Sequence, residues 1–187
     1  MKTSFYRRAA AACAAASFVI SSHAFAEVNL AQSSITAISK QMNVPVEGVF
    51  KKFSASIRFD PLKPASGSAQ LTVDVGSYDL GDESYDSQVA GKEWFDARTY
   101  PTATFVSSAI ATDGGNRYKV TGTLTIKGKS ETVVVPVILT QHDGMQSLDG
   151  TLSIKRSQFA IGTGEWRDTS IVADDVAIKF HIVASKF

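Results

Sequence analysis

Cysteine is nearly absent from this chain of 187 residues, and its absence excludes several kinds of site. The single cysteine, Cys13, lies in an N-terminal stretch that we expect to be cleaved, so the mature chain has none. Disulfides, thiolate nucleophiles, thioether-linked haem and cysteine–zinc centres are thereby excluded. Histidine is scarce as well: with His23 cleaved, His142 falls in a turn and His181 on an outer strand face, a spacing unlike that of metal ligands. The sequence therefore predicts neither a metal site nor a cofactor.

Long apolar runs are also missing. The apolar stretch 9–20 is too short to anchor the chain stably in a bilayer. It follows a basic segment and precedes Ala24-Phe25-Ala26, a small-x-small pattern typical of signal peptidase sites. We therefore expect a cleaved signal peptide over residues 1–26, a mature domain over residues 27–187, and a periplasmic location.

Neither sign of charge is in large excess. The chain has 19 basic and 18 acidic residues, and the expected signal peptide holds three of the basic ones and none of the acids. The mature chain therefore carries 16 basic and 18 acidic residues, a formal charge of −2. This balance gives no indication of a nucleic-acid surface. No linker, internal repeat or low-complexity tract divides the mature chain, which is long enough for one domain.

The most regular pattern predicts a β-hairpin. Residues 118–127 alternate strictly, and the face expected to be buried carries Tyr118, Val120, Gly122, Leu124 and Ile126. A period of two is typical of a strand with one dry and one wet face. Gly128-Lys129 is expected to form the tight turn, because glycine readily adopts a positive φ. The missing side chain of Gly122 predicts room for a cavity bordered by Leu124 and by Val135 on the returning strand.

Weaker alternation elsewhere predicts about eight strands in total. One short helix is expected, with Asp86 or Ser87 as its N-cap, running toward Phe95. It ends before Tyr100-Pro101, because the residue before a proline is pushed toward extended geometry. Strands of this number and spacing favour a closed antiparallel barrel or a sandwich. A barrel of this size either fills its interior with side chains or holds one small ligand, and periodicity alone does not separate the two.

Several segments, which together cover nearly all of the mature chain, occur in the order found in a known family. They are Pro45-Val46-Glu47-Gly48-Val49-Phe50-Lys51-Lys52-Phe53, Ile57-Arg58-Phe59-Asp60-Pro61, Glu93-Trp94-Phe95-Asp96, Tyr100-Pro101-Thr102-Ala103-Thr104-Phe105, Val120-Thr121-Gly122-Thr123-Leu124-Thr125-Ile126-Lys127-Gly128, Val133-Val134-Val135-Pro136-Val137, Arg156-Ser157-Gln158-Phe159-Ala160-Ile161-Gly162 and Asp174-Asp175-Val176. As a set they resemble the YceI-like family of exported polyisoprenoid-binding proteins. One segment departs from the family: Ala31-Gln32-Ser33-Ser34 stands where many relatives have an Asp…His-Ser pattern, so no role of that histidine is transferred.

The resemblance implies an all-β fold, a closed antiparallel lipocalin-like barrel of about eight strands with one short helix. It implies that the interior holds an isoprenoid lipid or a quinone-like amphiphile, which the protein binds and carries without catalysis. An apolar tail needs only an apolar lining of adequate width, because burial contributes about 25 cal/mol per Å² without directional partners. We expect no nucleic-acid partner and no integral membrane span. The sequence does not decide whether the protein is a monomer or a homodimer.

The candidate site residues fall into three groups. The predicted lining of the ligand site consists of inward-facing apolar residues: Phe50, Phe53, Ile57, Phe59, Leu71, Val73, Phe105, Val120, Leu124, Ile126, Val133, Val135, Ile178 and Phe180. Arg156 is the head-group candidate, because a guanidinium binds phosphate through two hydrogen bonds; an ion pair with Asp168 or Asp174 is the alternative. A cluster of aromatic residues forms either a lid over the ligand or a plug in one barrel end: Trp94, Phe95 and Tyr100.

Motifs typical of enzymes are absent from the sequence. It contains no Gly-x-Ser-x-Gly elbow and no segment with the paired acids of a glycosidase. We therefore predict no catalytic residue and a binding protein. Two alternatives stay open: an enzyme that acts on an isoprenoid lipid through scattered polar residues, and a solidly packed structural or interaction barrel without a ligand.

Overall fold

A computed structural model of the chain describes residues 26–185. The predicted signal peptide therefore lies outside the described residues, apart from Ala26. Within the described part, no helix is long and apolar enough to cross a membrane.

Ten strands form one antiparallel sheet in the order β3-β4-β6-β7-β8-β9-β10-β1-β2-β5. Their bounds are β1 (Ser34–Gln41), β2 (Val44–Phe50), β3 (Phe53–Arg58), β4 (Ser68–Asp74), β5 (Tyr78–Asp79), β6 (Thr102–Thr112), β7 (Arg117–Ile126), β8 (Lys129–His142), β9 (Met145–Lys155) and β10 (Asp175–Ser185). One short α-helix, α1 (Glu83–Ala90), and five 3₁₀ turns complete the fold. The prediction of an all-β fold with one short helix is confirmed.

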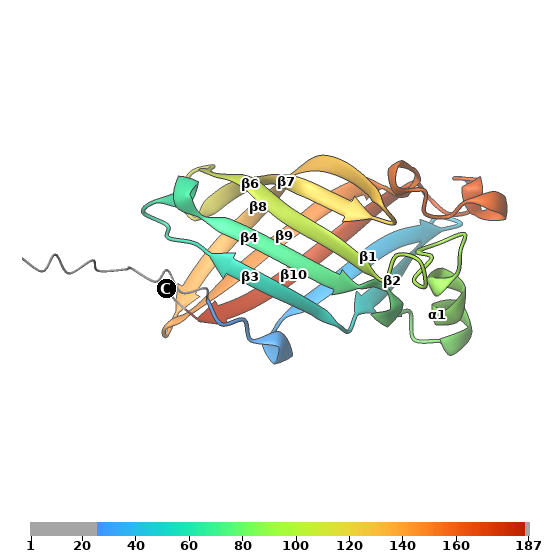
Figure 1. Ribbon diagram of the computed structural model, residues 1–187, viewed down its shortest axis with the longest axis horizontal. Coiled ribbons are helices and arrows are strands. Elements are labelled where there is room, and N and C mark those ends of the chain that lie inside the picture. Colours follow the sequence, from blue (N-terminus) through green and yellow to red (C-terminus); the bar gives the residue numbers. More distant parts are fainter. Residues whose placement is uncertain (1–25, 186–187) are drawn as a thin grey trace, which may run out of the picture.

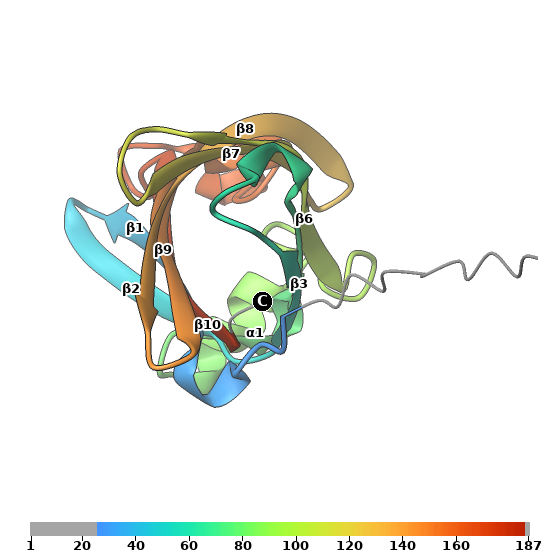
Figure 2. The same ribbon diagram turned by 90° about the vertical axis from the view of Figure 1, so that its left-hand side faces the viewer.

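The sheet curls around an interior, with α1 at one end and the described chain ends at the other (Figures 1 and 2). The prediction of about eight strands in a closed barrel is wrong in its details. Ten strands are present, and among the described residues the edge strands β3 and β5 do not pair with each other. The physical reason is that β2 pairs onward with the two-residue β5 rather than with β3. Two isolated bridges, Ala26 to Ile57 and Val28 to Ala184, link β3 and β10 near the chain ends.

The N-cap of helix α1 lies four residues before Asp86, the first of the two predicted caps. Asp82 is the N-cap, and its carboxylate accepts hydrogen bonds from the backbone N–H groups of Ser84 (2.9 Å) and Tyr85 (3.3 Å). Asp86 lies within the helix, and its carboxylate instead accepts from the backbone N–H of Leu80 at 2.7 Å. Both aspartates accept hydrogen bonds from backbone N–H groups near the start of the helix, so the sequence alone does not separate the cap from the helix interior.

The predicted hairpin is confirmed as β7 and β8, and the inward residues of β7 are all buried. The turn lies one residue earlier than expected, because Lys127 and Gly128, with φ of 49° and 71°, occupy its two central positions. Positive φ at both central residues is typical of the type I′ turn, whose twist matches that of a hairpin. The Lys127 Nζ donates hydrogen bonds to the carbonyl oxygens of Lys92 (2.8 Å) and Ala160 (2.9 Å), which connects the turn to two loops.

The room expected beside Gly122 is already occupied. A Cβ placed on Gly122 would lie 2.5 Å from Cζ of Phe105 and 2.5 Å from the carbonyl oxygen of Val106. The glycine therefore accommodates an aromatic ring from the neighbouring strand β6, a pairing that stabilises glycine in sheets. Its role is to let Phe105 lie against the wall, which differs from the empty space that the sequence suggested.

Gly122→Ala is expected to destabilise the protein by about 1–3 kcal/mol, because the added methyl group must displace a ring and a backbone carbonyl. Urea unfolding measures this difference. Gly76→Ala is the matched control, since a Cβ there would approach no atom more closely than 3.3 Å. A Gly122→Ala midpoint equal to that of the wild type would mean that Phe105 does not occupy this position in solution.

Candidate ligand-binding site

The interior of the curled sheet contains an apolar cavity of about 150 Å³. Its lining comes from seven strands that are neighbours in the sheet, β3, β4 and β6–β10, and from residue 59 just beyond β3. Among residues 26–185, no charged residue borders it. The lining residues are Ala55, Ile57, Phe59, Ala69, Gln70, Leu71, Phe105, Ile110, Tyr118, Val120, Leu124, Val135, Val137, Leu148, Leu152, Ile178, Phe180 and Ile182.

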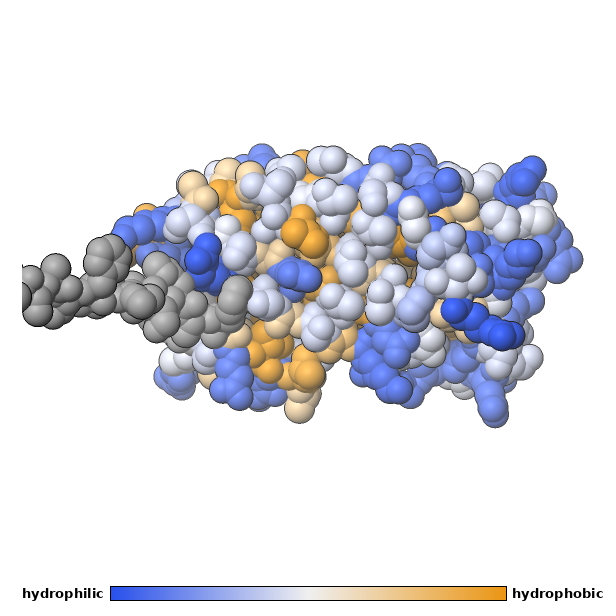
Figure 3. All heavy atoms as spheres, viewed as in Figure 1, coloured by the Kyte–Doolittle hydropathy of each residue, from blue (hydrophilic) through white to orange (hydrophobic). Residues whose placement is uncertain are grey.

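The cavity exists although large residues face the interior, because two phenylalanine rings lie over glycines. Phe180 on β10 is paired with Gly150 on β9, and its ring occupies the place of the missing side chain. Phe105 lies over Gly122 in the same way. Rings held against the wall leave the centre of the interior free. The outer surface is different: Figure 3 shows mostly polar and neutral residues on one face, with only small, separate apolar patches.

The structure divides the predicted lining residues into two groups. Those that border the cavity are Ile57, Phe59, Leu71, Phe105, Val120, Leu124, Val135, Ile178 and Phe180. Those that pack in the surrounding core without bordering it are Phe50, Phe53, Val73, Ile126 and Val133. That these residues contact a ligand stays a prediction.

The residues missing from the prediction are mostly alternate positions on strands already recognised. Ala55 precedes Ile57 by two residues, and Leu152 precedes Ile154 by two, so the period of two places them on the inner face. Periodicity identifies the inner face of a strand but not which of its residues border the cavity, and the missed residues include large ones such as Leu148 and Ile182 as well as small ones. Small residues such as Ala55 matter here because they leave the space that larger ones would fill.

Aromatic residues and a second apolar cluster fill the helix end of the interior. The ring of Phe50 lies 4.6 Å from that of Tyr78 and 6.0 Å from that of Phe95, measured between centroids. Burial raises the pKa of Tyr78 to about 12, and its hydroxyl donates a hydrogen bond to the Ala37 carbonyl at 3.2 Å. The second cluster consists of Leu124, Ile126, Ile154, Phe159 and Ile161.

The three residues predicted as a lid or plug do not lie together in one environment. Trp94 and Phe95 pack against the second cluster at the helix end. Tyr100 is exposed, and its ring lies over Gly128 at the β7–β8 turn. The first two therefore have the position that a plug requires, and their function stays a prediction.

Arg156 is 2% exposed, and its guanidinium is held by backbone carbonyls. The five N–H groups of the side chain donate to Ala173 (3.1 Å), Ile161 (2.9 Å), Gly162 (2.9 Å), Trp166 (2.7 Å) and Val172 (2.8 Å). Arginine has five such donors, so all are used. A phosphate head group would have to displace one of these carbonyls, which the arrangement disfavours.

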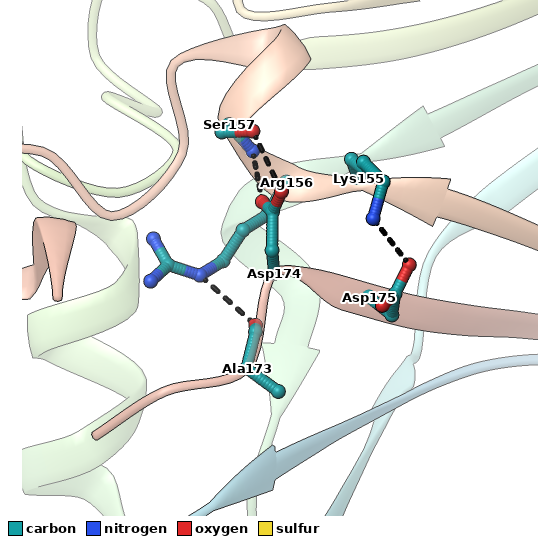
Figure 4. A network of polar contacts seen from close by, with 6 residues as sticks. All are labelled: Lys155, Arg156, Ser157, Ala173, Asp174 and Asp175. Atoms are coloured by element: carbon teal, nitrogen blue, oxygen red, sulfur yellow. Dashed lines mark hydrogen bonds and ion pairs between the residues drawn. The ribbon is translucent and has the colours of Figure 1, made fainter. Parts of the chain in front are cut away.

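The acids near Arg156 have other partners (Figure 4). The carboxylate of Asp174 accepts from the backbone N–H of Ser157 (2.9 Å) and from its hydroxyl (3.0 Å), and Asp175 pairs with Lys155 at 3.0 Å. Asp168 bonds Ser170. Burial lowers the pKa of Arg156, with Asp174 acting in the opposite direction. The geometry thus favours a structural role for Arg156: its guanidinium holds together the segment that connects β9 to β10.

The two histidines lie apart. His142 is exposed at the end of β8, whereas Nδ1 of His181 is 2.5 Å from a carboxylate oxygen of Asp149 on the outer face of the sheet. Across residues 26–185, no three side chains of His, Cys, Asp or Glu gather in a metal-binding arrangement.

Comparison with protein families gives a match to the YceI-like domain over residues 27–184. The chain belongs to the YceI-like family. Among solved structures, Burkholderia cenocepacia BcnA is 67% identical, with a TM-score of 0.84, and the match covers 85% of this chain and all of BcnA. The YCEI protein of Campylobacter jejuni is 27% identical, with a TM-score of 0.69, and the match covers 76% of this chain and 85% of that one.

Two further relatives extend the YceI-like comparison. A polyisoprenoid-binding domain from Saccharophagus degradans, implicated in plant cell wall breakdown, is 16% identical with a TM-score of 0.69, which shows a shared fold. That match covers 87% of this chain and 98% of that one. A UPF0312 protein from Photorhabdus laumondii is 36% identical over 92 residues, 49% of this chain and 45% of the relative. The chain spans about half the length of the curated relatives it matches.

Proposed function

We propose that this YceI-like protein is a non-catalytic periplasmic carrier of an isoprenoid lipid or a similar long-chain amphiphile. The tail occupies the interior of the curled sheet, and the signal peptide expected over residues 1–26 directs export. The observation that carries the proposal is the apolar cavity, which seven strands line without a charged residue. The polyisoprenoid binding stated for the Saccharophagus degradans domain supports the same ligand class.

The physical chemistry of the lining favours binding over catalysis. Removing an apolar tail from water contributes about 25 cal/mol per Å² of buried area and needs no directional partner. General acid or base catalysis requires a titratable group within hydrogen-bond reach of the reacting atoms. The lining residues supply one tyrosine, Tyr118, and no histidine, lysine or acid. A carrier therefore fits this interior better than an enzyme.

The size of the cavity also bears on how a lipid enters. Apolar cavities of about 150 Å³ in other proteins hold a benzene-sized molecule. A tail of several isoprene units therefore requires the interior to widen as it binds.

Organic extraction of the purified protein, followed by lipid mass spectrometry, tests the function. We expect an isoprenoid or another long-chain amphiphile in near-stoichiometric amount, and native mass spectrometry should show the corresponding mass on the intact protein. Protein purified in the same way that carries no lipid, and that takes none up from prenol micelles, would contradict the proposal and favour a structural barrel.

A further inference from the structure

One polar side chain is buried on the inner face of the curled sheet, near the end where the described chain ends lie. Gln146 is 1% exposed and lies on β9, two residues before Leu148, which borders the cavity. Alternation along the strand therefore points both side chains inward. Gln146 pairs across the ladder with Ala184 on β10, which is fully buried.

The two polar atoms of this amide differ in their partners. The Nε2 group donates a hydrogen bond to the Ser185 carbonyl at 3.2 Å. The Oε1 atom is buried and has no hydrogen-bond partner within residues 26–185. Leaving a buried acceptor unpaired is unfavourable, so such an atom in a native protein indicates a missing donor. The neighbouring inward residues Leu139, Leu148 and Ile182 have no polar side-chain atoms and offer none.

We propose that Oε1 of Gln146 accepts a hydrogen bond from an uncharged hydroxyl at the end of the bound lipid. This inference rests on the proposed function and specifies its ligand class. A free acceptor selects a donor, so a prenol or a quinol binds better than a prenyl ether or a quinone. A phosphate end is disfavoured, because no charged residue borders the cavity to compensate it.

The test compares two ligands that differ by one donor. Geranylgeraniol and its methyl ether are titrated into the lipid-stripped protein, and their affinities are measured by native mass spectrometry. For the wild type, the alcohol is expected to bind about tenfold more tightly, as one buried hydrogen bond allows. In Gln146→Met, which has a side chain of similar size and no amide, the two ligands should bind equally. Gln141→Met is the matched control, because Gln141 faces Gln146 across the β8–β9 ladder but is exposed. It should keep the tenfold preference.

The possible outcomes separate this inference from the proposed function. Equal affinities in the wild type, or a Gln146→Met variant that loses both ligands to the same degree, would overturn the hydrogen bond while leaving a lipid carrier in place. Binding of neither ligand would overturn both. If Gln146→Met does not fold, Gln146→Leu and the wild-type comparison still decide, since the preference for the alcohol is a property of the unaltered protein.

Discussion

Ala55→Trp is expected to reduce lipid uptake by at least about tenfold while leaving the lipid-free protein as stable as the wild type or more stable. Ala55 faces the cavity from the edge strand β3 and is the smallest kind of side chain in the lining. An indole at this position occupies the space that a tail would fill. Because that space is empty, the indole gains contacts without displacing a packed side chain.

Thermal melting of the lipid-stripped proteins and uptake of a fluorescent prenol measure the two effects. Ser54→Trp is the matched control, since Ser54 is the neighbouring residue on the same strand and is exposed. It should bind lipid like the wild type. A solidly packed interior predicts a different result for Ala55→Trp, a loss of about 1–3 kcal/mol through strained rotamers, and observing it would refute the cavity.

Arg156→Ala is expected to destabilise the protein by at least about 3 kcal/mol, because several buried carbonyls lose their donor together. The affected carbonyls belong to residues 161–173, the connection between β9 and β10. Arg156→Lys should give an intermediate loss, since an ammonium group has three donors and lacks the planar fork. Urea unfolding of each variant provides the measurement.

Lys155→Ala serves as the control for Arg156, because Lys155 is the adjacent residue and its ion pair with Asp175 is exposed. Exposed ion pairs contribute little, so this variant should unfold like the wild type. An Arg156→Ala protein of unchanged stability that no longer binds a lipid phosphate would instead support the head-group role.

The inner faces of the long strands were predictable from sequence, as the burial of Tyr118, Val120, Leu124 and Ile126 illustrates. There, a period of two and the requirement for one dry face leave a single arrangement. The strand count and the closure were not predictable. They depend on the two-residue β5 and on the bridges of Ala26 and Val28, which are too short to produce a periodic pattern.

The site was partly predictable for a related reason. Hydrophobicity identifies inward residues but does not say whether the space between them is filled, which depends on where rings such as Phe105 and Phe180 lie. The partners of Arg156 were not predictable from the sequence either. Its partners are backbone carbonyls, and a carbonyl has no signature in the sequence, whereas the acids that the sequence does reveal bond serines or lysine instead.

The pairing of β1 with β10 also determines when the sheet can be completed. The ladder joins Ser34 to His181, so the first strand of the chain has the last one as its neighbour. In synthesis and in the proposed export alike, β1 emerges before β10 and must wait for it, and contacts so distant in sequence form slowly. Until then β1 presents an open edge, which is a template for pairing with other chains. The time that the segment between them takes to emerge is therefore the shortest period for which this edge is exposed.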